Sequence, residues 1–476
     1  MTSTLTTHNT PPPAPTKTPA KMARKKPWLA ALLLRLHFYA GILIGPFILV
    51  AALSGALYAA TPQLEQAIYA EELRVPTAET SLPLADQIDA AQAVVGDEGS
   101  LVAVRPAPNN GDTTRVMFTG EGLGESETRA IFVNPANAEV RGDLTVYGTS
   151  GALPLRTWID QFHRNLHLGD FGRLYSELAA SWLGVVVLAG AALWIIRIRK
   201  ARVKKDLLRP NNRVKGYRRI FSWHASTGIW LLIGALFLSA TGITWSQYAG
   251  ENVSNLRAAF NVGTPSVSTA LGSLPDAAAG EHDSHGVAQG SSSTIDPATF
   301  DAVLAVAQEV NVNTGLVEIR PPATADTAWV VQEIQRSYPT EVDAVAINGA
   351  TLQVTDQVNF SEFSLAAKLA RWGIDTHMGT MFGLPNQIVL VLTALGIAAM
   401  VTWGYLMWWK RRPTRGARLG KPAPAGALAD APWWGVAAVI GVAIVVGLFF
   451  PLVGISLVGF LIIDALLVLR PAKKPA

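Results

Sequence analysis

Uninterrupted apolar stretches long enough to cross a bilayer recur along this chain and constrain its fold more than any other feature. A transmembrane helix needs about 20 consecutive apolar residues, and within a bilayer only helices and closed barrels satisfy their own backbone groups. We therefore expect an α-helical integral membrane protein, with Pro451 turning the last two stretches into a helical hairpin. The stretches lie at residues 28–60, 177–197, 222–247, 386–409, 433–450 and 452–469.

Clusters of Lys and Arg border these stretches and predict the orientation of the chain. Basic loops next to transmembrane helices stay in the cytoplasm, so both chain ends are expected inside, and residues 61–160 and 250–370 outside. We expect a multi-pass protein of the bacterial inner membrane, in contact with lipid. The clusters also account for the net charge of +4, so the charge gives no indication of a nucleic-acid partner. The clusters lie at 21–26, 197–205, 213–219, 410–412 and 473–474.

The apolar stretches and basic clusters together predict the domain organisation. In chain order we expect a disordered cytoplasmic tail (1–27), a first span (28–60), a first outward module (61–160), a histidine segment with the second span (161–200), a basic cytoplasmic loop (201–219), a third span (220–249), a second outward module (250–370), a histidine segment with the fourth span (371–412), a cytoplasmic linker (413–431) and the terminal hairpin (432–470).

A histidine motif, His-x3-Gly-x12-[Ser/Thr]-Gly, occurs in both the first and the third span. It begins at His37 and again at His224. Histidine within a membrane span is a candidate functional residue. Because 18 residues of a continuous α-helix make five turns and rise about 27 Å, we expect each His and its distant Gly on one helix face. His167-Leu-Gly and His377-Met-Gly then head the second and fourth spans, so the chain consists of two similar units.

The outward segments also resemble each other. Residues 84–95 and 298–310 have the pattern of amphipathic helices. Residues 132–140 and 345–353 each indicate a strand, a turn rich in Asn, Pro or Gly, and a second strand. We expect one small α+β module in each unit.

Depth in the membrane pairs the histidines across the two units. His37 and His224 lie in spans that enter the membrane from the inside, whereas His167 and His377 precede spans that enter it from the outside. If the units pack about a twofold axis, each pair converges, which is the arrangement that a b-type haem with two axial imidazoles needs. We expect two haems in a four-helix core. The chain has no cysteine, which excludes covalent haem attachment through Cys-x-x-Cys-His.

Three alternatives remain open at these histidines. Single interfacial histidines often only make hydrogen bonds, and small residues often only permit close helix packing. Imidazoles also suit zinc, copper or other iron sites. His163 lies four residues before His167 and shares its helix face, so either could be the outer ligand, although position relative to the repeat favours His167.

The chain resembles the PepSY-associated transmembrane proteins, a family that includes iron-regulated inner-membrane proteins and FoxB-like ferric-siderophore reductases. The resemblance implies PepSY-like periplasmic modules and a haem-containing reductase that passes electrons to a ferric siderophore or a similar periplasmic iron complex. It rests on Leu36-His37-Phe38-Tyr39-Ala40-Gly41, Gly45-Pro46-Phe47, Ser54-Gly55, Phe132-Val133-Asn134-Pro135, His163-Arg164-Asn165-Leu166-His167, Trp223-His224, Thr241-Gly242 and His377-Met378-Gly379-Thr380.

The electron donor is expected to be a separate molecule. No glycine-rich dinucleotide motif opens a βαβ unit, and the predicted cytoplasmic loops are too short to hold one. A cytoplasmic reductase or membrane quinol is therefore expected. The competing class is a non-enzymatic membrane scaffold or peptidase-regulating module, which needs no membrane histidine. A transporter is the third class, but the sequence shows no paired broken helices around a midplane polar site.

Overall fold

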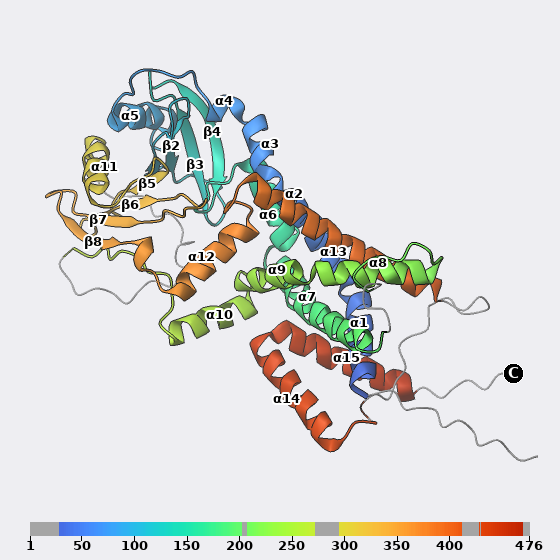
Figure 1. The fold of residues 1–476 in the computed structure, drawn as a ribbon. Coiled ribbons are helices and arrows are strands. Elements are labelled where there is room, and N and C mark those ends of the chain that lie inside the picture. Colours follow the sequence, from blue (N-terminus) through green and yellow to red (C-terminus); the bar gives the residue numbers. More distant parts are fainter. Residues whose placement is uncertain (1–27, 202–206, 272–294, 412–427, 429, 470–476) are drawn as a thin grey trace, which may run out of the picture.

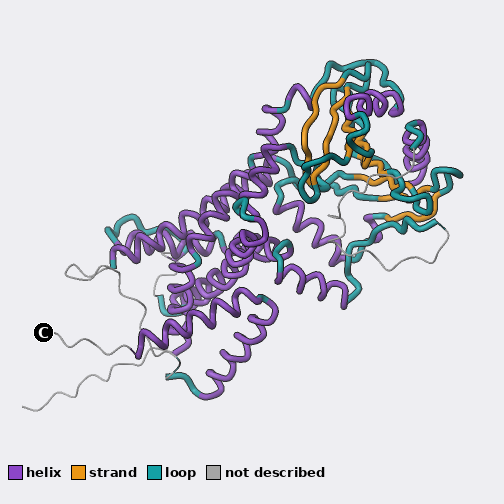
Figure 2. Tube along the Cα trace, turned by 180° about the vertical axis from the view of Figure 1, so that it is seen from behind, coloured by secondary structure: helices purple, strands orange, loops and turns teal. Residues whose placement is uncertain are grey.

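The computed structural model describes residues 28–201, 207–271, 295–411, 428 and 430–469. The predicted tail at 1–27 and nearly all of the predicted linker at 413–431 lie outside the described residues. The described chain is mostly helical, with one β-sheet at one end of a bundle of helices (Figures 1 and 2).

The helical part is built on two long helices and two bent helix pairs. By length and composition, two described helices can each cross a membrane, or up to four if each bent pair is one span. The long helices are α7 (Gly169–Ile198) and α13 (Leu384–Lys410); the bent pairs are α1 (Trp28–Leu43) with α2 (Gly45–Ala59), and α8 (Tyr217–Trp230) with α9 (Leu232–Thr244).

The bends correct two expectations from the sequence. The axes of α1 and α2 differ by 61°, and those of α8 and α9 by 62°. The histidine motif therefore does not lie along one straight helix face, and paired broken helices are present. Pro46 at the start of α2 explains the first bend, because proline lacks an N–H and clashes with the preceding turn. Nothing in the sequence around Leu231 explains the second.

A single antiparallel sheet of eight strands contains both outward modules. The strand order is β4-β3-β2-β1-β5-β6-β7-β8, and β1 joins β5 through Val104 and Ile319. The sequence predicted two modules but gave no sign that they share a sheet. The strands are β1 (Leu101–Arg105), β2 (Thr114–Phe118), β3 (Glu127–Val133), β4 (Val140–Tyr147), β5 (Val317–Arg320), β6 (Trp329–Glu333), β7 (Ala344–Ile347) and β8 (Val354–Val358).

Two helices pack on one face of this sheet and confirm the amphipathic patterns. They are α5 (Leu84–Val95) and α11 (Ala298–Val310), with the bounds that the sequence predicted. Their apolar sides share one core with strands of both modules, because alternate residues of a strand point to the same face. The predicted strand-turn-strand units are also present, as β3–β4 and β7–β8. Each turn contains one residue with positive φ, Ala138 and Leu352.

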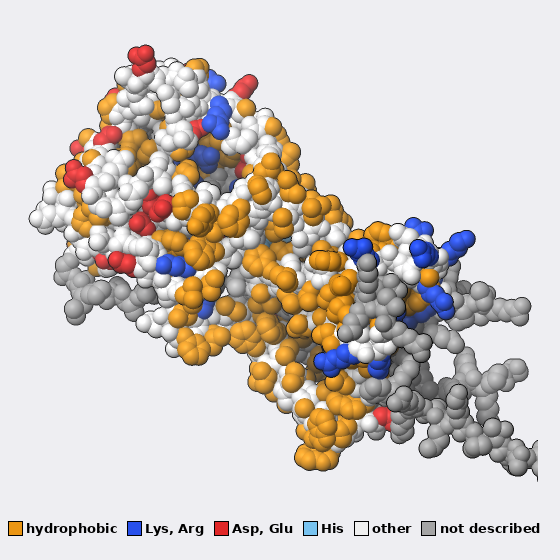
Figure 3. Space-filling model, viewed as in Figure 1, with side chains coloured by type: hydrophobic (Ala, Val, Ile, Leu, Met, Phe, Trp, Pro, Cys, Tyr) orange, Lys and Arg blue, Asp and Glu red, His pale blue; other side chains and the backbone are white. Residues whose placement is uncertain are grey.

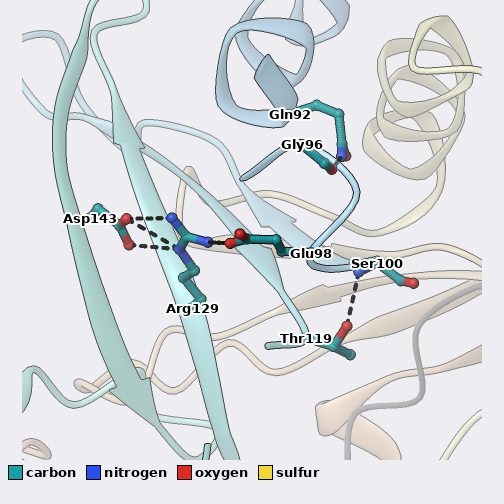
Figure 4. A network of polar contacts seen from close by, with 7 residues as sticks. All are labelled: Gln92, Gly96, Glu98, Ser100, Thr119, Arg129 and Asp143. Carbon is teal, nitrogen blue, oxygen red and sulfur yellow. Dashed lines mark hydrogen bonds and ion pairs between the residues drawn. The ribbon is translucent and has the colours of Figure 1, made fainter. Parts of the chain in front are cut away.

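The other face of the first module lies towards the membrane helices. It is covered by α3 (Thr61–Ile68), α4 (Ala70–Leu73) and α6 (Pro154–Asn165), which continue from α2 or precede α7. At the far edge of the module, Arg129 donates hydrogen bonds to both carboxylate oxygens of Asp143, and it also pairs with Glu98 (Figure 4). This network ties β3 and β4 to the loop after α5.

Three more helices complete the connection between the sheet and the membrane helices in the second unit. They are α10 (Tyr248–Ala259), the 3-10 helix η3 (Phe360–Glu362) and α12 (Leu365–His377). The hydroxyl of Ser364 caps α12 by accepting from the N–H of Ala367. Helix α12 therefore starts at a defined residue and carries His377 at its last position.

The C-terminal hairpin packs on the bundle through α7. It consists of α14 (Trp433–Phe449) and α15 (Pro451–Leu469), and both are apolar helices. Gly447 and Gly454 bring the two helices into close contact. Trp182, which is fully buried, donates from Nε1 to Ser456 Oγ at 2.8 Å. The hairpin is thus anchored by a polar contact as well as by apolar packing.

The surface divides into three zones. Apolar side chains cover the helical part, whereas Asp and Glu lie on the sheet end, and Lys and Arg gather at the opposite end (Figure 3). Along α13, for example, Leu384, Ile388 and Leu392 are each about half exposed. An exposed apolar surface this extensive marks a surface that meets lipid or another apolar partner.

Candidate functional site

Two of the predicted histidines meet at the end of the bundle far from the sheet. The imidazole centroids of His37, on α1, and His224, on α8, are 6.1 Å apart with the ring planes at 75°. An imidazole nitrogen binds a first-row metal ion at about 2.0–2.1 Å, so two imidazoles on opposite sides of one ion have centroids about 6.3 Å apart. We call His37 and His224 the distal pair; their separation suits one shared metal centre.

Helix α7 fixes the orientation of His37. Its Nδ1 lies 2.9 Å from the backbone oxygen of Val186. Because a carbonyl oxygen can only accept a hydrogen bond, Nδ1 must carry the proton. Nε2 is then the nitrogen with a free lone pair. Gly190 permits the approach, because a Cβ there would lie 3.0 Å from the imidazole. In His224, Nδ1 is buried without a hydrogen-bond partner in the described chain.

The other end of the bundle, near the sheet, holds a second set of histidine contacts. His163, on α6, places Nδ1 2.9 Å from Ser54 Oγ. The single proton of that hydroxyl is directed to the backbone oxygen of Val50, at 2.8 Å. With its proton directed to Val50, Ser54 accepts from Nδ1–H of His163, and Nε2 of His163 is then unprotonated. Gly55 lies against the same ring, with a hypothetical Cβ 3.1 Å from it.

The second unit repeats this contact. Nδ1 of His377 lies 2.6 Å from Thr241 Oγ1, whose proton is directed to the backbone oxygen of Phe237 at 2.7 Å. His377 is therefore also protonated on Nδ1, and a Cβ at the neighbouring Gly242 would lie 3.9 Å from its ring. The [Ser/Thr]-Gly end of the sequence motif thus supports a histidine of the same unit.

His163, and not His167, occupies the position that corresponds to His377. Helix α6 ends at Asn165, and both Leu166 and His167 adopt positive φ, which turns the chain into α7. His167 is exposed and packs on Trp158, with ring centroids 4.9 Å apart. The sequence repeat favoured His167 as the counterpart of His377, but in the structure that counterpart is His163. We call His163 and His377 the proximal pair; they are close enough for the charge of one to act on the other.

One spacing in the sequence distinguishes the two candidates. His163 precedes Gly190 by 27 residues, and His377 precedes Gly404 by the same number. The interval from His167 to Gly190 is four residues shorter. Alignment of the second and fourth spans on these glycines would have selected His163 without a structure.

The donor set fits a haem better than a bare metal ion. Structural metal sites use three or four protein ligands. In the described chain, no group of three ligating side chains includes any of these histidines. A haem supplies four ligands of its own and needs only the two axial imidazoles. Proton acceptors on Nδ1 are typical outer partners of metal-bound histidines, and three of the four histidines of the two pairs have one.

A cavity of about 610 Å³ lies between α3, α6 and the first module. Arg156, two helical turns before His163 on α6, lines it together with Glu65 and Arg115. Arg156 pairs with Glu65 at 3.6 Å and donates to the hydroxyl of Tyr58 at 3.1 Å. Sites of this volume hold small molecules of drug size.

Arg115 contributes positive charge to this cavity. It lies directly opposite Arg105 across β1 and β2, and like charges in that relation are destabilising. Arg105 pairs with Glu318 of the second module at 2.6 Å, whereas Arg115 forms no ion pair in the described chain. It donates to the oxygen of Gly151 at 3.2 Å. Glu65 and Asp112 offset part of the repulsion between the two guanidinium groups, and an anion in the cavity would offset more of it.

The pKa values outside the membrane helices show the same imbalance. Burial, and next the like charge of Arg105, lowers the pKa of Arg115 to about 10. Burial, and next Arg371, lowers the pKa of Arg336 to about 10. Both guanidinium groups stay protonated at neutral pH, but the lowered values show that their charge is poorly stabilised. This part of the molecule therefore favours anionic ligands.

The fold and the site together define a class: a membrane protein in which paired histidines lie in a helical bundle beneath one shared sheet. The model of the PepSY-associated TM region matches residues 34–411. The chain thus belongs to the PepSY-associated transmembrane family, which the sequence motifs had indicated. No curated protein sequence matches the chain.

Proposed function

We propose that this protein is a haem-b-containing reductase of the bacterial inner membrane that moves electrons across the bilayer to a periplasmic iron complex, with a ferric siderophore as the expected acceptor. The observation that carries the proposal is that Nδ1 of His37, His163 and His377 lies within hydrogen-bond distance of a chain oxygen in each case, which leaves Nε2 available to a metal. In this proposal the chain is two duplicated units, and each histidine pair takes one member from each unit.

The orientation follows from charge. Described Lys and Arg residues gather at the end that holds the distal pair, and the positive-inside rule assigns this end to the cytoplasm. The sheet is then periplasmic, and the chain crosses the membrane several times with both termini inside. The distal pair would serve the electron donor, a cytoplasmic reductase or membrane quinol, and the proximal pair would serve the acceptor.

The residues of each pair would hold one haem b through Nε2. When bound, haem supplies reversible one-electron chemistry at its iron. The chain contributes orientation: Val186, Ser54 and Thr241 hold imidazoles in one tautomer, and Gly190 and Gly55 let the rings lie against neighbouring helices. The apolar helices around both pairs exclude water.

The arginine-lined cavity is the proposed docking site of the acceptor. Its volume of about 610 Å³ suits a compact iron chelate, and Arg115 supplies charge for anionic oxygen donors. Arg156 connects the cavity to His163 along α6, because seven residues of helix span about 10 Å. Reduction transfers one electron to the chelate and converts Fe(III) to Fe(II), which binds anionic oxygen donors less tightly, so the metal leaves an intact chelator.

Haem content tests the proposal directly. Protein purified in detergent after haem-supplemented expression should give about two b-type haems per chain in a pyridine haemochrome assay. His163→Ala and His224→Ala should each remove one haem, whereas His167→Ala should retain both. Reduced protein should then convert a ferric hydroxamate siderophore to a product that a ferrous chelator captures. A colourless wild-type protein would reject the proposal and favour a scaffold or peptidase-regulating module.

A further inference from the structure

The β6–β7 hairpin of the second module carries three carboxylates that converge away from the histidine pairs. Glu333 ends β6, Asp343 precedes β7, and Glu341 lies in the loop between them. One carboxylate oxygen from each residue lies within 4.8 Å of the other two. No Lys or Arg forms an ion pair with any of the three in the described part of the chain, so their negative charge is not balanced by the protein.

Glu333 shows that this is more than a group of surface acids. Its side chain is fully buried, at 0% exposed. One oxygen, Oε1, accepts from the backbone N–H groups of Asn313 and Thr314 at 2.6 and 2.8 Å. The other oxygen, Oε2, is buried and has no hydrogen-bond partner. A buried acceptor left without a partner costs free energy, and an ionised one costs considerably more.

We propose that Glu333, Glu341 and Asp343 form a binding site for a hard divalent cation, with Ca²⁺ as the expected occupant. Oxygen ligands of this kind suit Ca²⁺, Mg²⁺ and Mn²⁺, and not the soft or imidazole-preferring metals. Two oxygens bound to one Ca²⁺ at 2.3–2.6 Å are at most about 5 Å apart, which the observed spread satisfies. The cation would offset two of the three negative charges and supply the missing partner of Glu333.

The position of the site indicates what the cation would do. The hairpin reaches the segment that follows His377: Tyr338 donates its N–H to the oxygen of Met381 at 2.8 Å, and the hydroxyl of Thr340 contacts the sulfur of Met381. The base of the same hairpin holds the three carboxylates. A bound cation would therefore brace the hairpin against the connection between α12 and α13, at a place that contributes no ligand to the histidine pairs.

The site is tested by binding of Mn²⁺ to the full chain in detergent. Binding is measured as the loss of the free-ion signal in electron paramagnetic resonance. We expect one Mn²⁺ per chain in chelator-free buffer, displaced by excess Ca²⁺, with a dissociation constant of about 10⁻⁴–10⁻³ M. Glu341→Gln should weaken binding at least tenfold. Glu309→Gln, which removes the same charge from an exposed position on α11, should leave it unchanged.

Thermal unfolding separates lost binding from lost folding. Excess Ca²⁺ should raise the melting temperature of the wild type and of Glu309→Gln by several degrees, and it should not raise that of Glu341→Gln. Without Ca²⁺, Glu341→Gln should melt no lower than the wild type, because one of three repelling charges is gone. Absence of saturable Mn²⁺ binding, or equal binding by the Glu341 and Glu309 variants, would overturn the proposal. Asp343→Asn gives an independent second test.

Discussion

Ser54→Ala removes the hydroxyl that lies against Nδ1 of His163, and its effect on haem binding can be worked out from the structure. The hydroxyl accepts from Nδ1 at 2.9 Å while its own proton is directed to Val50. The substitution leaves a buried N–H without an acceptor, which costs about 1–3 kcal/mol. Since 1.4 kcal/mol is a factor of ten, haem should bind about 5- to 100-fold more weakly. Removal of outer partners of metal-bound histidines weakens metal binding by a similar 10–100-fold.

The assay is haem transfer from the detergent-purified protein to an excess of apomyoglobin. One of the two expected haems should leave Ser54→Ala about 5- to 100-fold faster than the wild type, while the other is unaffected. Ser54→Thr should behave like the wild type, because Thr241 plays the same part in the second unit. Its reduced-minus-oxidised spectrum should also keep the wild-type absorbance.

Ser456→Ala provides the matched control. Ser456 also directs its proton to a carbonyl four residues earlier and also accepts from a buried ring nitrogen, that of Trp182 at 2.8 Å. Its loss should cost comparable stability without touching a histidine. If haem leaves Ser54→Ala no faster than Ser456→Ala, the assignment of Ser54 as the partner of a metal-bound histidine is refuted.

Three further predictions concern other parts of the site. Gly55→Ala places a Cβ 3.1 Å from the neighbouring imidazole, whereas Gly242→Ala places one at an ordinary 3.9 Å. Haem per chain should therefore fall clearly in Gly55→Ala and little in Gly242→Ala. Arg115→Gln should lower kcat/KM for an anionic ferric chelate about tenfold or more, because a charged hydrogen bond contributes about 1.5–3 kcal/mol, and should leave reduction of a neutral chelate unchanged. Although burial opposes ionisation, Arg105 and then Arg320 hold the pKa of Glu318 below its usual value. The ion pair therefore stabilises the fold above the unfolded pKa of about 4.3 and is lost as pH falls through the lower, folded pKa. Glu318→Gln should melt at a lower temperature at pH 7 and depend less on pH in the acid range; identical acid profiles would contradict this.

Local patterns predicted the local elements well. The bounds of α5 and α11 follow from apolar residues at helical spacing, and the β3–β4 and β7–β8 hairpins follow from short strands around turn residues. These signals depend on neighbours in the sequence. The pairing of β1 with β5 does not depend on sequence neighbours. Each of these strands has the pattern of an ordinary strand, and each has its partner in the other module.

The site was predictable in its residues and less so in its geometry. Repetition identified His37, His224 and His377, whereas it favoured His167 over His163. The choice between these two depended on the positive φ of Leu166 and His167, which no residue preference indicates. The bend at Leu231 likewise has no proline to mark it, although Gly228 and Gly234 lie three residues to either side. The cavity could not be predicted, since Arg115 and Arg156 meet there from a strand and a helix far apart in the chain.

The pairing of β1 with β5 also determines how long one strand edge stays unpaired while the protein is synthesised. Val104 and Ile319, which pair with each other, are 215 residues apart. At about 5–20 residues per second, a ribosome needs roughly 10–40 s to make the second partner after the first. During that interval α7 and α9 must pack while one edge of β1 is unpaired. An unpaired strand edge can associate with other chains. The nascent protein therefore passes through a period in which a chaperone that covers strand edges would protect it most.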